Sequence, residues 1–216
     1  MIHHPSPNAG PRRDGLRPEL VVLHFTEMAS AEAALARLCD PSAEVSAHYL
    51  IGRDGRLWHL VDEEMRAWHA GAGAWRGRGD VNSRSIGIEL DNDGRSPFTQ
   101  PLMARLERLL PGILTRWAIP ARGVIAHSDM APDRKVDPGA RFDWQRLARQ
   151  GLAIWPWTPG APQAPLAGSL DRIGYPDTRA DLRLRAFRLR FRPGHHGPED
   201  GQDRALADAV AHLSDD

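Results

Sequence analysis

The chain has 216 residues, of which 41% are hydrophobic and 26% charged, a composition typical of a globular protein with one ordinary core. Its 28 basic and 28 acidic residues balance, so the sequence lacks the positive charge that nucleic-acid-binding proteins usually carry. The single cysteine, Cys39, excludes an intrachain disulfide and a cysteine-rich zinc site. No run of about 18 apolar residues occurs, so we expect no membrane span and no nucleic-acid partner.

The first part of the chain contains the patterns of an arm, a strand and a helix, in that order. Residues 1–18 are rich in Pro, Gly and Arg and predict an irregular arm. The apolar run 20–23 is β-branched at its centre, which is typical of a strand covered on both faces, and it ends at His24. Ser30 predicts the N-cap of a helix over residues 31–38.

A hairpin, a loop and another strand follow. Residues 48–51 and 56–61 are apolar runs on either side of an Asp-Gly turn, which is a strong signal for a β-hairpin. The glycine-rich stretch 71–80 predicts a loop. The run Ile-Gly-Ile-Glu-Leu at residues 86–90 predicts a short strand.

A long helix and one further strand complete the pattern. Thr99 predicts the cap of a helix that continues to Trp117, with apolar residues at helical spacing. Pro111 lies inside this helix and predicts a kink. The apolar run 124–126 predicts a strand that ends at His127. Strands interleaved with two main helices predict an α/β fold, with a mixed central β-sheet flanked by helices.

The last sixty residues have a different composition. Residues 156–165 contain four prolines, which cannot continue a helix or a sheet, and they predict a stiff linker. Residues 166–216 contain three short patterns of apolar residues at helical spacing, which predict a small all-helical domain. Because about fifty residues build only a marginal core, we expect this domain to lean on a catalytic domain formed by residues 1–155.

Three polar side chains lie at the ends of predicted strands, namely His24, Glu89 and His127. A sheet holds such side chains firmly and presents them at its rim. Two imidazoles and one carboxylate form a ligand set of catalytic zinc, which keeps a fourth coordination position open. Each histidine taken alone is equally well explained as a buried structural residue. Spacing cannot decide between these readings, because His24 and His127 are more than a hundred positions apart.

The polar loop that follows His127 favours a metal site. It contains Lys135 and Asp137, and two prolines restrict its backbone. Lys135 and Asp137 are two residues apart, so an extended backbone directs both side chains to the same side. One of them can then bind a metal while the other places a positive charge beside it.

Five motifs across residues 4–150 resemble those of the zinc-dependent N-acetylmuramoyl-L-alanine amidases, whose fold is shared with phage lysozyme-type amidases and peptidoglycan-recognition proteins. The motifs are Val-Val-Leu-His24-Phe-Thr, Val-Ser-Ala-His48-Tyr-Leu-Ile, Ala-Trp68-His69-Ala-Gly, Asn82-Ser-Arg-Ser-Ile-Gly-Ile-Glu89-Leu and the segment 127–139. They occur in the order that the family shows. The resemblance implies a mostly β central sheet with helices packed against it and a zinc ion in a groove at its rim.

The resemblance also implies roles for five residues. Those matching His24, His127 and Asp137 bind one zinc ion, and those matching Glu89 and Lys135 are catalytic. Asp137 stands where the phage branch has cysteine, which matches the bacterial recycling-type branch. We expect Glu89 to act as general base on water and then to protonate the leaving amine, and Lys135 to stabilise the oxyanion. The reaction implied is hydrolysis of the amide between the lactyl group of N-acetylmuramic acid and L-alanine, in peptidoglycan or in (anhydro)muropeptides.

Other parts of the resemblance carry less information. Trp68, His69 and His48 are candidate substrate contacts, but His48 and Trp68 are equally well explained as core residues of the hairpin region. Residues 166–216 resemble the small helical peptidoglycan-binding module that follows some of these amidases, for example at Ile173-Gly-Tyr-Pro-Asp. Binding of the cell wall is one hypothesis for this domain, and a structural brace is the alternative.

Two other functional classes have less support in the sequence. A non-catalytic protein that recognises peptidoglycan fragments usually lacks one of the metal ligands, whereas this chain retains all three. A zinc peptidase is not supported by any His-Glu-x-x-His motif. The start of the chain lacks the apolar stretch of a secretory signal, which favours the cytoplasm and recycled muropeptides. The C-terminal module favours the periplasm and the polymeric wall. We expect a monomer whose partner is peptidoglycan or a muropeptide.

Overall fold

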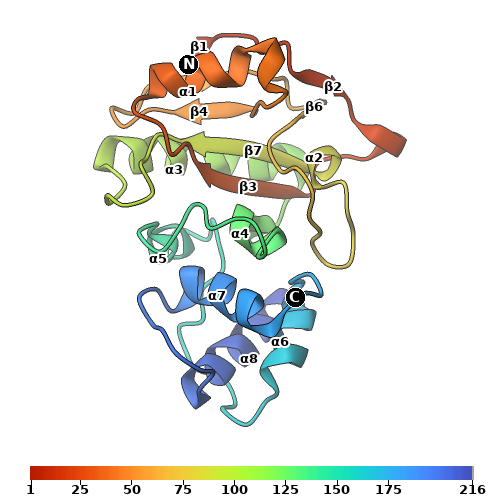
Figure 1. Ribbon diagram of the computed structural model, residues 1–216, viewed down its shortest axis with the longest axis vertical. Helices are drawn as coiled ribbons and strands as arrows, with labels where there is room; N and C mark the ends of the chain where they lie inside the picture. Colours follow the sequence, from red (N-terminus) through yellow and green to blue (C-terminus); the bar gives the residue numbers. More distant parts are fainter. Residues whose placement is uncertain (216) are drawn as a thin grey trace.

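A mixed six-stranded sheet forms the centre of the computed structural model, which describes residues 1–215 (Figure 1). The strands, in spatial order, are β1 (Ile2–His3), β5 (Leu57–His59), β4 (Tyr49–Ile51), β7 (Ser85–Leu90), β3 (Leu20–Phe25) and β8 (Val124–Ala126). Neighbouring strands run parallel except β4 and β5, which form the predicted hairpin. A second sheet pairs β2 (Ala9–Pro11) with β6 (Met65–Ala67) in antiparallel orientation. The predicted fold class is confirmed.

Helices cover both faces of the sheet and continue into a separate layer at the C-terminal end. They are α1 (Ala31–Cys39), α2 (Val81–Arg84), α3 (Gln100–Trp117), α4 (His127–Met130), α5 (Trp144–Ala148), α6 (Leu166–Ile173), α7 (Ala180–Phe191) and α8 (Gly201–Asp215). The predicted caps of α1 and α3 are confirmed, because the hydroxyl groups of Ser30 and Thr99 accept hydrogen bonds from the first turns of these helices. α3 continues as one helix through Pro111.

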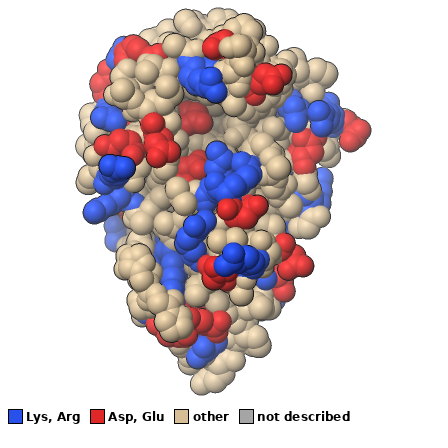
Figure 2. Space-filling model, viewed as in Figure 1, with Lys and Arg blue, Asp and Glu red and all other residues tan. Residues whose placement is uncertain are grey.

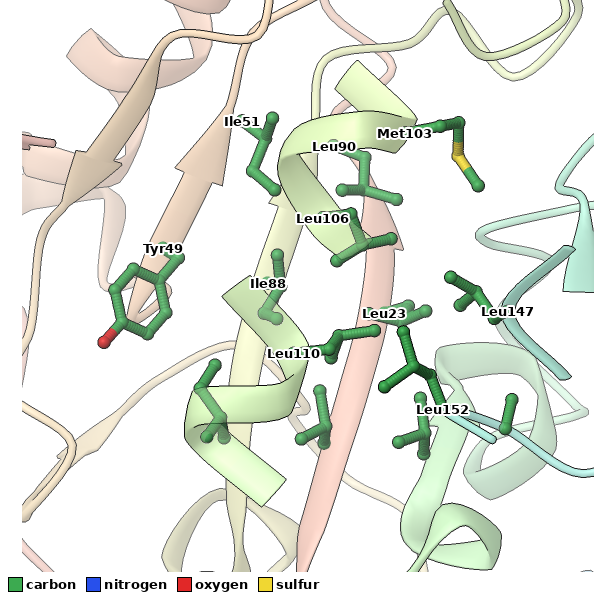
Figure 3. Packing of buried hydrophobic residues seen from close by; sticks show 14 of the residues in the cluster. Leu23, Tyr49, Ile51, Ile88, Leu90, Met103, Leu106, Leu110, Leu147 and Leu152 are labelled. Atoms are coloured by element: carbon green, nitrogen blue, oxygen red, sulfur yellow. The ribbon is translucent and has the colours of Figure 1, made fainter. Parts of the chain in front are cut away.

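One face of the sheet packs against α3. Figure 3 shows Leu106 and Leu110 of α3 among the side chains of Leu23 on β3 and of Ile88 and Leu90 on β7. All five residues are fully buried. This apolar cluster holds the two central strands in place, since burying a large aliphatic side chain stabilises the fold by about 1.5–3 kcal/mol.

The opposite face of the sheet carries the polar residues predicted at the strand ends. Side chains alternate along a strand, so His24 follows Leu20 and Val22 on this face of β3, and Glu89 lies on the same face of β7. β3 and β7 are parallel neighbours, and His24 and Glu89 are direct partners in their register. The sheet therefore fixes the relative positions of these two residues.

The C-terminal helices share a core with this second face. Ile125 of β8 and Met130 of α4 belong to one apolar cluster with Leu170, Phe187 and other residues of α6–α8. Figure 1 shows α4 and α5 between β3 and the layer formed by α6, α7 and α8. The predicted contact of the helical segment with the first domain is present, and residues 156–165 contain neither helix nor strand.

The surface charges are mixed. Figure 2 shows acidic and basic side chains interleaved on one face of the molecule, in keeping with the zero formal net charge. Among residues 1–215, no helix combines the length and the apolar character that a bilayer crossing requires.

Candidate active site

His24, His127 and Asp137 converge at one edge of the sheet. His24 lies near the end of β3, His127 follows β8 directly as the first residue of α4, and Asp137 lies on the loop after α4. The His24 Nδ1 and His127 Nδ1 atoms are 2.9 Å apart, and the Asp137 Oδ2 atom lies 3.1 Å from the first and 2.9 Å from the second. All three residues are buried.

The tautomer of His24 follows from a chain of hydrogen bonds behind it. Ser85 donates its only hydroxyl hydrogen to the Val81 carbonyl at 2.5 Å, so its oxygen accepts from His69 Nε2 at 3.1 Å. A neutral His69 then has an acceptor at Nδ1, which lies 3.0 Å from His24 Nε2. His24 therefore carries its hydrogen on Nε2 and directs the lone pair of Nδ1 toward Asp137.

The tautomer of His127 is fixed in the same way by a backbone group. Its Nε2 lies 2.9 Å from the carbonyl oxygen of Ala70, which can only accept, so Nε2 carries the hydrogen. The Nδ1 atoms of His24 and His127 and a carboxylate oxygen of Asp137 are consequently three acceptors that face one another. Three lone pairs that converge in this way can bind a cation, and two imidazoles with one carboxylate suit zinc. The residues present thus fit the metal that the sequence predicts.

The charge states of these groups agree with a ligand set. Burial, together with the nearby His127, lowers the pKa of His24 to about 4, although Asp137 opposes this shift. Burial alone would raise the pKa of Asp137, but the neighbouring His127 and His24 outweigh burial and lower that pKa. At neutral pH the site therefore presents a neutral His24 imidazole and an ionised Asp137 carboxylate.

Glu89 lies beside the metal-ligand group in a cavity of about 320 Å³. Its Oε2 atom is buried and has no hydrogen-bond partner within residues 1–215. Burial raises the pKa of Glu89 well above its ordinary value of 4.5, and the negative charge of Asp137 adds to this shift while Lys135 opposes it. A carboxylate that is partly desolvated and free of protein partners is suited to exchange a proton with a bound molecule.

Lys135 lines the same cavity as Glu89 and Asp137. It is the only lysine of the chain, among 28 basic residues. The segment 131–137 that carries it is held by a backbone hydrogen bond from Lys135 N to Ala131 O at 3.0 Å, and by one from Ser128 N to Asp137 O at 3.0 Å. The structure therefore brings together the five residues that the resemblance implied.

The three candidate substrate residues have different surroundings. Trp68 and His69 line the cavity, as predicted, although both ring nitrogens of His69 are engaged by His24 and Ser85. His48 does not line it. Its side chain is fully buried, and its Nδ1 accepts a hydrogen bond from Gly87 N at 2.9 Å. The position of His48 therefore supports its interpretation as a core residue, because a side chain without exposed surface cannot contact substrate.

Two residues that shape the site were assigned no role from the sequence. Asn82 accepts hydrogen bonds from the backbone N–H groups of His69 and Ala70, at 3.0 and 2.8 Å, and so fixes the segment that orients both histidine ligands. Gly87 leaves room for the His69 ring, since a Cβ atom there would lie 2.3 Å from it. Asn82 and Gly87 belong to the motif of residues 82–90, but only the fold reveals their contacts with residues 69 and 70.

Two other features of residues 1–215 lack this chemistry. A larger pocket of about 970 Å³ lies between α6, α7 and the loop after α7, away from the converging ligands. A second acidic group surrounds Asp200 and Asp203, but Arg192 and Arg188 already pair with these carboxylates. The smaller cavity is therefore the candidate active site, because it alone combines the ligand triad with an unpartnered carboxylate in the part of the chain described.

Known proteins share both the sequence and the fold of this chain. The Amidase_2 family, described as N-acetylmuramoyl-L-alanine amidase, matches residues 14–140. The N-acetylmuramoyl-L-alanine amidase AmiD of Escherichia coli is 37% identical over 231 residues, which cover 90% of this chain and 82% of AmiD. The 1,6-anhydro-N-acetylmuramyl-L-alanine amidase AmpD of Escherichia coli is 35% identical over 66% of this chain and 87% of its own length.

Solved structures agree. AmiD in complex with the substrate anhydro-N-acetylmuramic acid-L-Ala-D-gamma-Glu-L-Lys superposes with a TM-score of 0.82 and 34% identity, over 99% of this chain and 94% of AmiD. AMPDH3 from Pseudomonas aeruginosa, in complex with anhydromuramic pentapeptide, gives a TM-score of 0.82 at 30% identity, over 93% of this chain and 94% of its own. This chain belongs to the N-acetylmuramoyl-L-alanine amidase family and is an amide hydrolase.

Proposed function

We propose that this amidase is a zinc enzyme that releases the stem peptide from soluble anhydromuropeptides by cleaving the amide between the lactyl group and L-alanine. One observation carries the proposal: three lone pairs, from His24, His127 and Asp137, converge beside the unpartnered carboxylate of Glu89. The similarity to AmiD and AMPDH3, whose solved complexes contain anhydromuramic peptides, supports this class of substrate.

The metal and the protein divide the chemistry. His24, His127 and Asp137 would hold one zinc ion, which acts as a Lewis acid that polarises a carbonyl group and makes water more acidic. The amide is a poor electrophile, so its carbonyl carbon accepts water only when the negative charge that forms on its oxygen is stabilised. The ammonium group of Lys135, which lines the same cavity, supplies a positive charge for this purpose.

Glu89 transfers the proton. Its carboxylate accepts a proton from the attacking water as the new C–O bond forms, and it donates that proton to the nitrogen of L-alanine as the C–N bond breaks. The products are a lactyl carboxylate and a peptide with a free amino group, so the atoms of one water molecule are accounted for. The raised pKa of Glu89 suits this role, because a carboxylate with a raised pKa both accepts and holds a proton more readily.

The walls of the cavity provide surfaces for the substrate. Trp68 offers an aromatic ring and Arg37 a cationic group, while Val45 and Met28 add apolar contacts. Such a mixture suits a ligand that combines a sugar ring with an anionic peptide. His69 lines the cavity as well, but its ring nitrogens are committed to His24 and Ser85.

The test offers the purified zinc-loaded protein two substrates in parallel, anhydro-N-acetylmuramyl tripeptide and intact sacculi. We expect mass spectrometry to detect free peptide beginning with L-alanine from the soluble compound. Removal of the metal with a chelator should stop the release, and added zinc should restore it. Release from sacculi alone would overturn the proposed substrate class. Binding of the tripeptide without release of peptide would instead support recognition without catalysis.

A further inference from the structure

We propose that the C-terminal helices position the metal-binding loop, through hydrogen bonds from Tyr175 and Arg190 to Asp129. This inference rests on the proposed metal site, since it assigns Tyr175 and Arg190 as positioning residues for the ligand His127. Asp129 lies two residues after His127 within α4. Both donors come from the segment that follows the proline-rich stretch 156–165.

Asp129 is fully buried and carries three hydrogen bonds. Its Oδ1 accepts from the Tyr175 hydroxyl at 2.7 Å, and its Oδ2 accepts from Arg190 Nη1 at 2.8 Å and from the backbone N–H of Ala126 at 2.9 Å. A buried carboxylate must be paired, because an ion removed from water without partners is strongly destabilising. Two of the three partners of Asp129 therefore belong to the C-terminal segment, Tyr175 in the loop between α6 and α7 and Arg190 in α7.

The two donors are themselves held firmly. Only 3% of the Arg190 residue is exposed, and its guanidinium carbon lies 4.0 Å from the ring centroid of Trp144 on α5. The ring of Tyr175 packs edge-on against Trp75, with 5.4 Å between centroids. Asp129 is the one polar partner that the Arg190 side chain has among residues 1–215, since its Nε and Nη2 atoms have none. A buried arginine with this single polar contact is directed specifically at Asp129.

Further contacts join the same two parts of the molecule. Arg185 of α7 donates a hydrogen bond to the carbonyl oxygen of Pro132 at 2.8 Å. Ile125, Met130 and Ala131 belong to one apolar cluster with Phe187 and its neighbours on the C-terminal helices. Figure 1 shows α4 between the sheet and these helices. The contacts thus cover residues 125–132, which lead into and out of the ligand His127.

The C-terminal helices influence the site without lining it. The residues that line the cavity all lie between positions 24 and 137, so no described residue of α6, α7 or α8 reaches it. α4 has only four residues, and a helix of that length is not stable without tertiary contacts. The orientation of His127 therefore depends on what packs against α4, which on its outer side is the C-terminal segment.

The test compares two tyrosine variants. Tyr175→Phe removes the hydroxyl that binds Asp129, whereas Tyr49→Phe removes a hydroxyl that donates to the buried Glu63 at the same distance of 2.7 Å, on the α3 face of the sheet. Zinc affinity is measured by competition with a chromophoric chelator, and deuterium uptake of residues 126–137 is measured in the metal-free protein. We expect Tyr175→Phe to weaken zinc binding by about tenfold and to speed exchange, since one lost bond to a buried carboxylate costs about that factor. Tyr49→Phe should change neither quantity.

Two arginine variants provide an independent test. Arg190→Met removes the second donor to Asp129, and Arg188→Met removes a buried ion pair with Asp203 that lies wholly within the C-terminal helices. We expect Arg190→Met to weaken zinc binding by more than tenfold and Arg188→Met to lower only the thermal midpoint. Arg190→Lys, which keeps a positive donor, should retain more affinity than Arg190→Met. An equal loss in Arg188→Met would show that general loosening of the helices is responsible and would overturn the inference.

The outcomes separate this inference from the proposed function. A wild-type protein that binds zinc and cleaves its substrate, together with Tyr175→Phe and Arg190→Met variants within twofold of its affinity, contradicts the inference alone. A wild-type protein that binds no zinc contradicts the proposed function, and deuterium uptake of the loop then still decides the inference. If Arg190→Met does not fold, the Tyr175→Phe variant, which removes a single oxygen, carries the test.

Discussion

The candidate site is held in two different ways on its two sides. His24 and Glu89 lie on neighbouring central strands and are direct partners in the register of β3 and β7, so the sheet fixes their backbone positions. His127, Lys135 and Asp137 lie on the segment between β8 and α5, which contains a single short helix. We call the first two residues the strand side and the other three the loop side.

The two sides differ in how far along the sequence their supporting residues lie. On the strand side, the sheet and the α3 layer behind it place the residues, and local alternation decides which face they occupy. On the loop side, support comes from Ala70, which binds His127, and from Tyr175 and Arg190, which bind Asp129. We expect substitutions on the strand side to change catalysis while the site residues keep their positions. We expect substitutions on the loop side to change those positions.

The largest expected effect separates chemistry from metal binding on the strand side. Glu89→Gln keeps the shape of the side chain but cannot accept a proton, so kcat should fall by about 10²- to 10⁴-fold. Zinc content, measured by elemental mass spectrometry, should remain at the wild-type level, because Glu89 is outside the ligand group. Full hydrolytic activity in this variant would exclude Glu89 as the general base.

The next effect concerns the charge on the loop side. Lys135→Gln removes the positive group that faces the developing oxyanion, and we expect kcat to fall by about 10²- to 10³-fold with little change in KM. Lys135→Arg, which keeps the charge, serves as the control and should retain more activity. Amine-selective acylation gives a second route, because Lys135 is the only lysine and the α-amino group the only other amine target. An acylated enzyme with unchanged kcat would contradict the role of Lys135.

A third variant tests whether the strand-side ligand also needs outside support. His69→Phe keeps an aromatic ring over Gly87 but removes the acceptor for His24 Nε2, so His24 loses its fixed tautomer. We expect the affinity for zinc to fall by about 10- to 100-fold, as is typical when the partner of a metal-ligating histidine is lost. Chelator competition measures this change. An unchanged affinity would mean that β3 alone orients His24.

Asn82 supports both sides of the site, so its substitution tests whether the two sides respond independently. Its side-chain oxygen binds the N–H groups of His69 and Ala70, which orient His24 and His127 respectively. Asn82→Ala leaves two buried N–H groups without partners, and we expect zinc affinity to fall by about tenfold. Deuterium uptake should rise in both residues 68–70 and 127–137. A rise confined to residues 68–70 would show that Ala70 does not transmit the change to the loop side.

The smallest effect is a shift in pH dependence. The ionised form of Glu89 is the one that accepts a proton, so kcat/KM should rise with pH through the pKa of this group. Lys135 lowers that pKa, and removing its charge should raise it. The acid limb of the pH profile for Lys135→Gln should therefore lie at higher pH than that of the wild type. A shift toward lower pH would contradict the proximity of the two groups.

The strand side could be predicted from the sequence because its information is local. Apolar runs at residues 20–23, 86–90 and 124–126 predicted the strands on which His24 and Glu89 lie and after which His127 follows, and the structure confirmed these strands. The motif resemblance then supplied Lys135 and Asp137. The predicted substrate contact at His48 was the exception, because sequence does not show whether a histidine beside the hairpin faces the cavity or the core.

The sequence by itself predicted the strands β3, β4, β5, β7 and β8 and the main helices with their caps, because periodicity and capping act over a few residues, and the motif resemblance supplied the candidate ligand residues. It did not predict β1 and β2, which lie in the arm expected to be irregular, or β6, because strands of two or three residues show no pattern. Tertiary structure alone decided the tautomers of His24 and His127, the support from Asn82 and the link from Asp129 to Tyr175 and Arg190. These contacts join residues from 12 to 61 positions apart, with no periodic signal between them. They exist because a buried polar group must find its partner in space, wherever the chain supplies one.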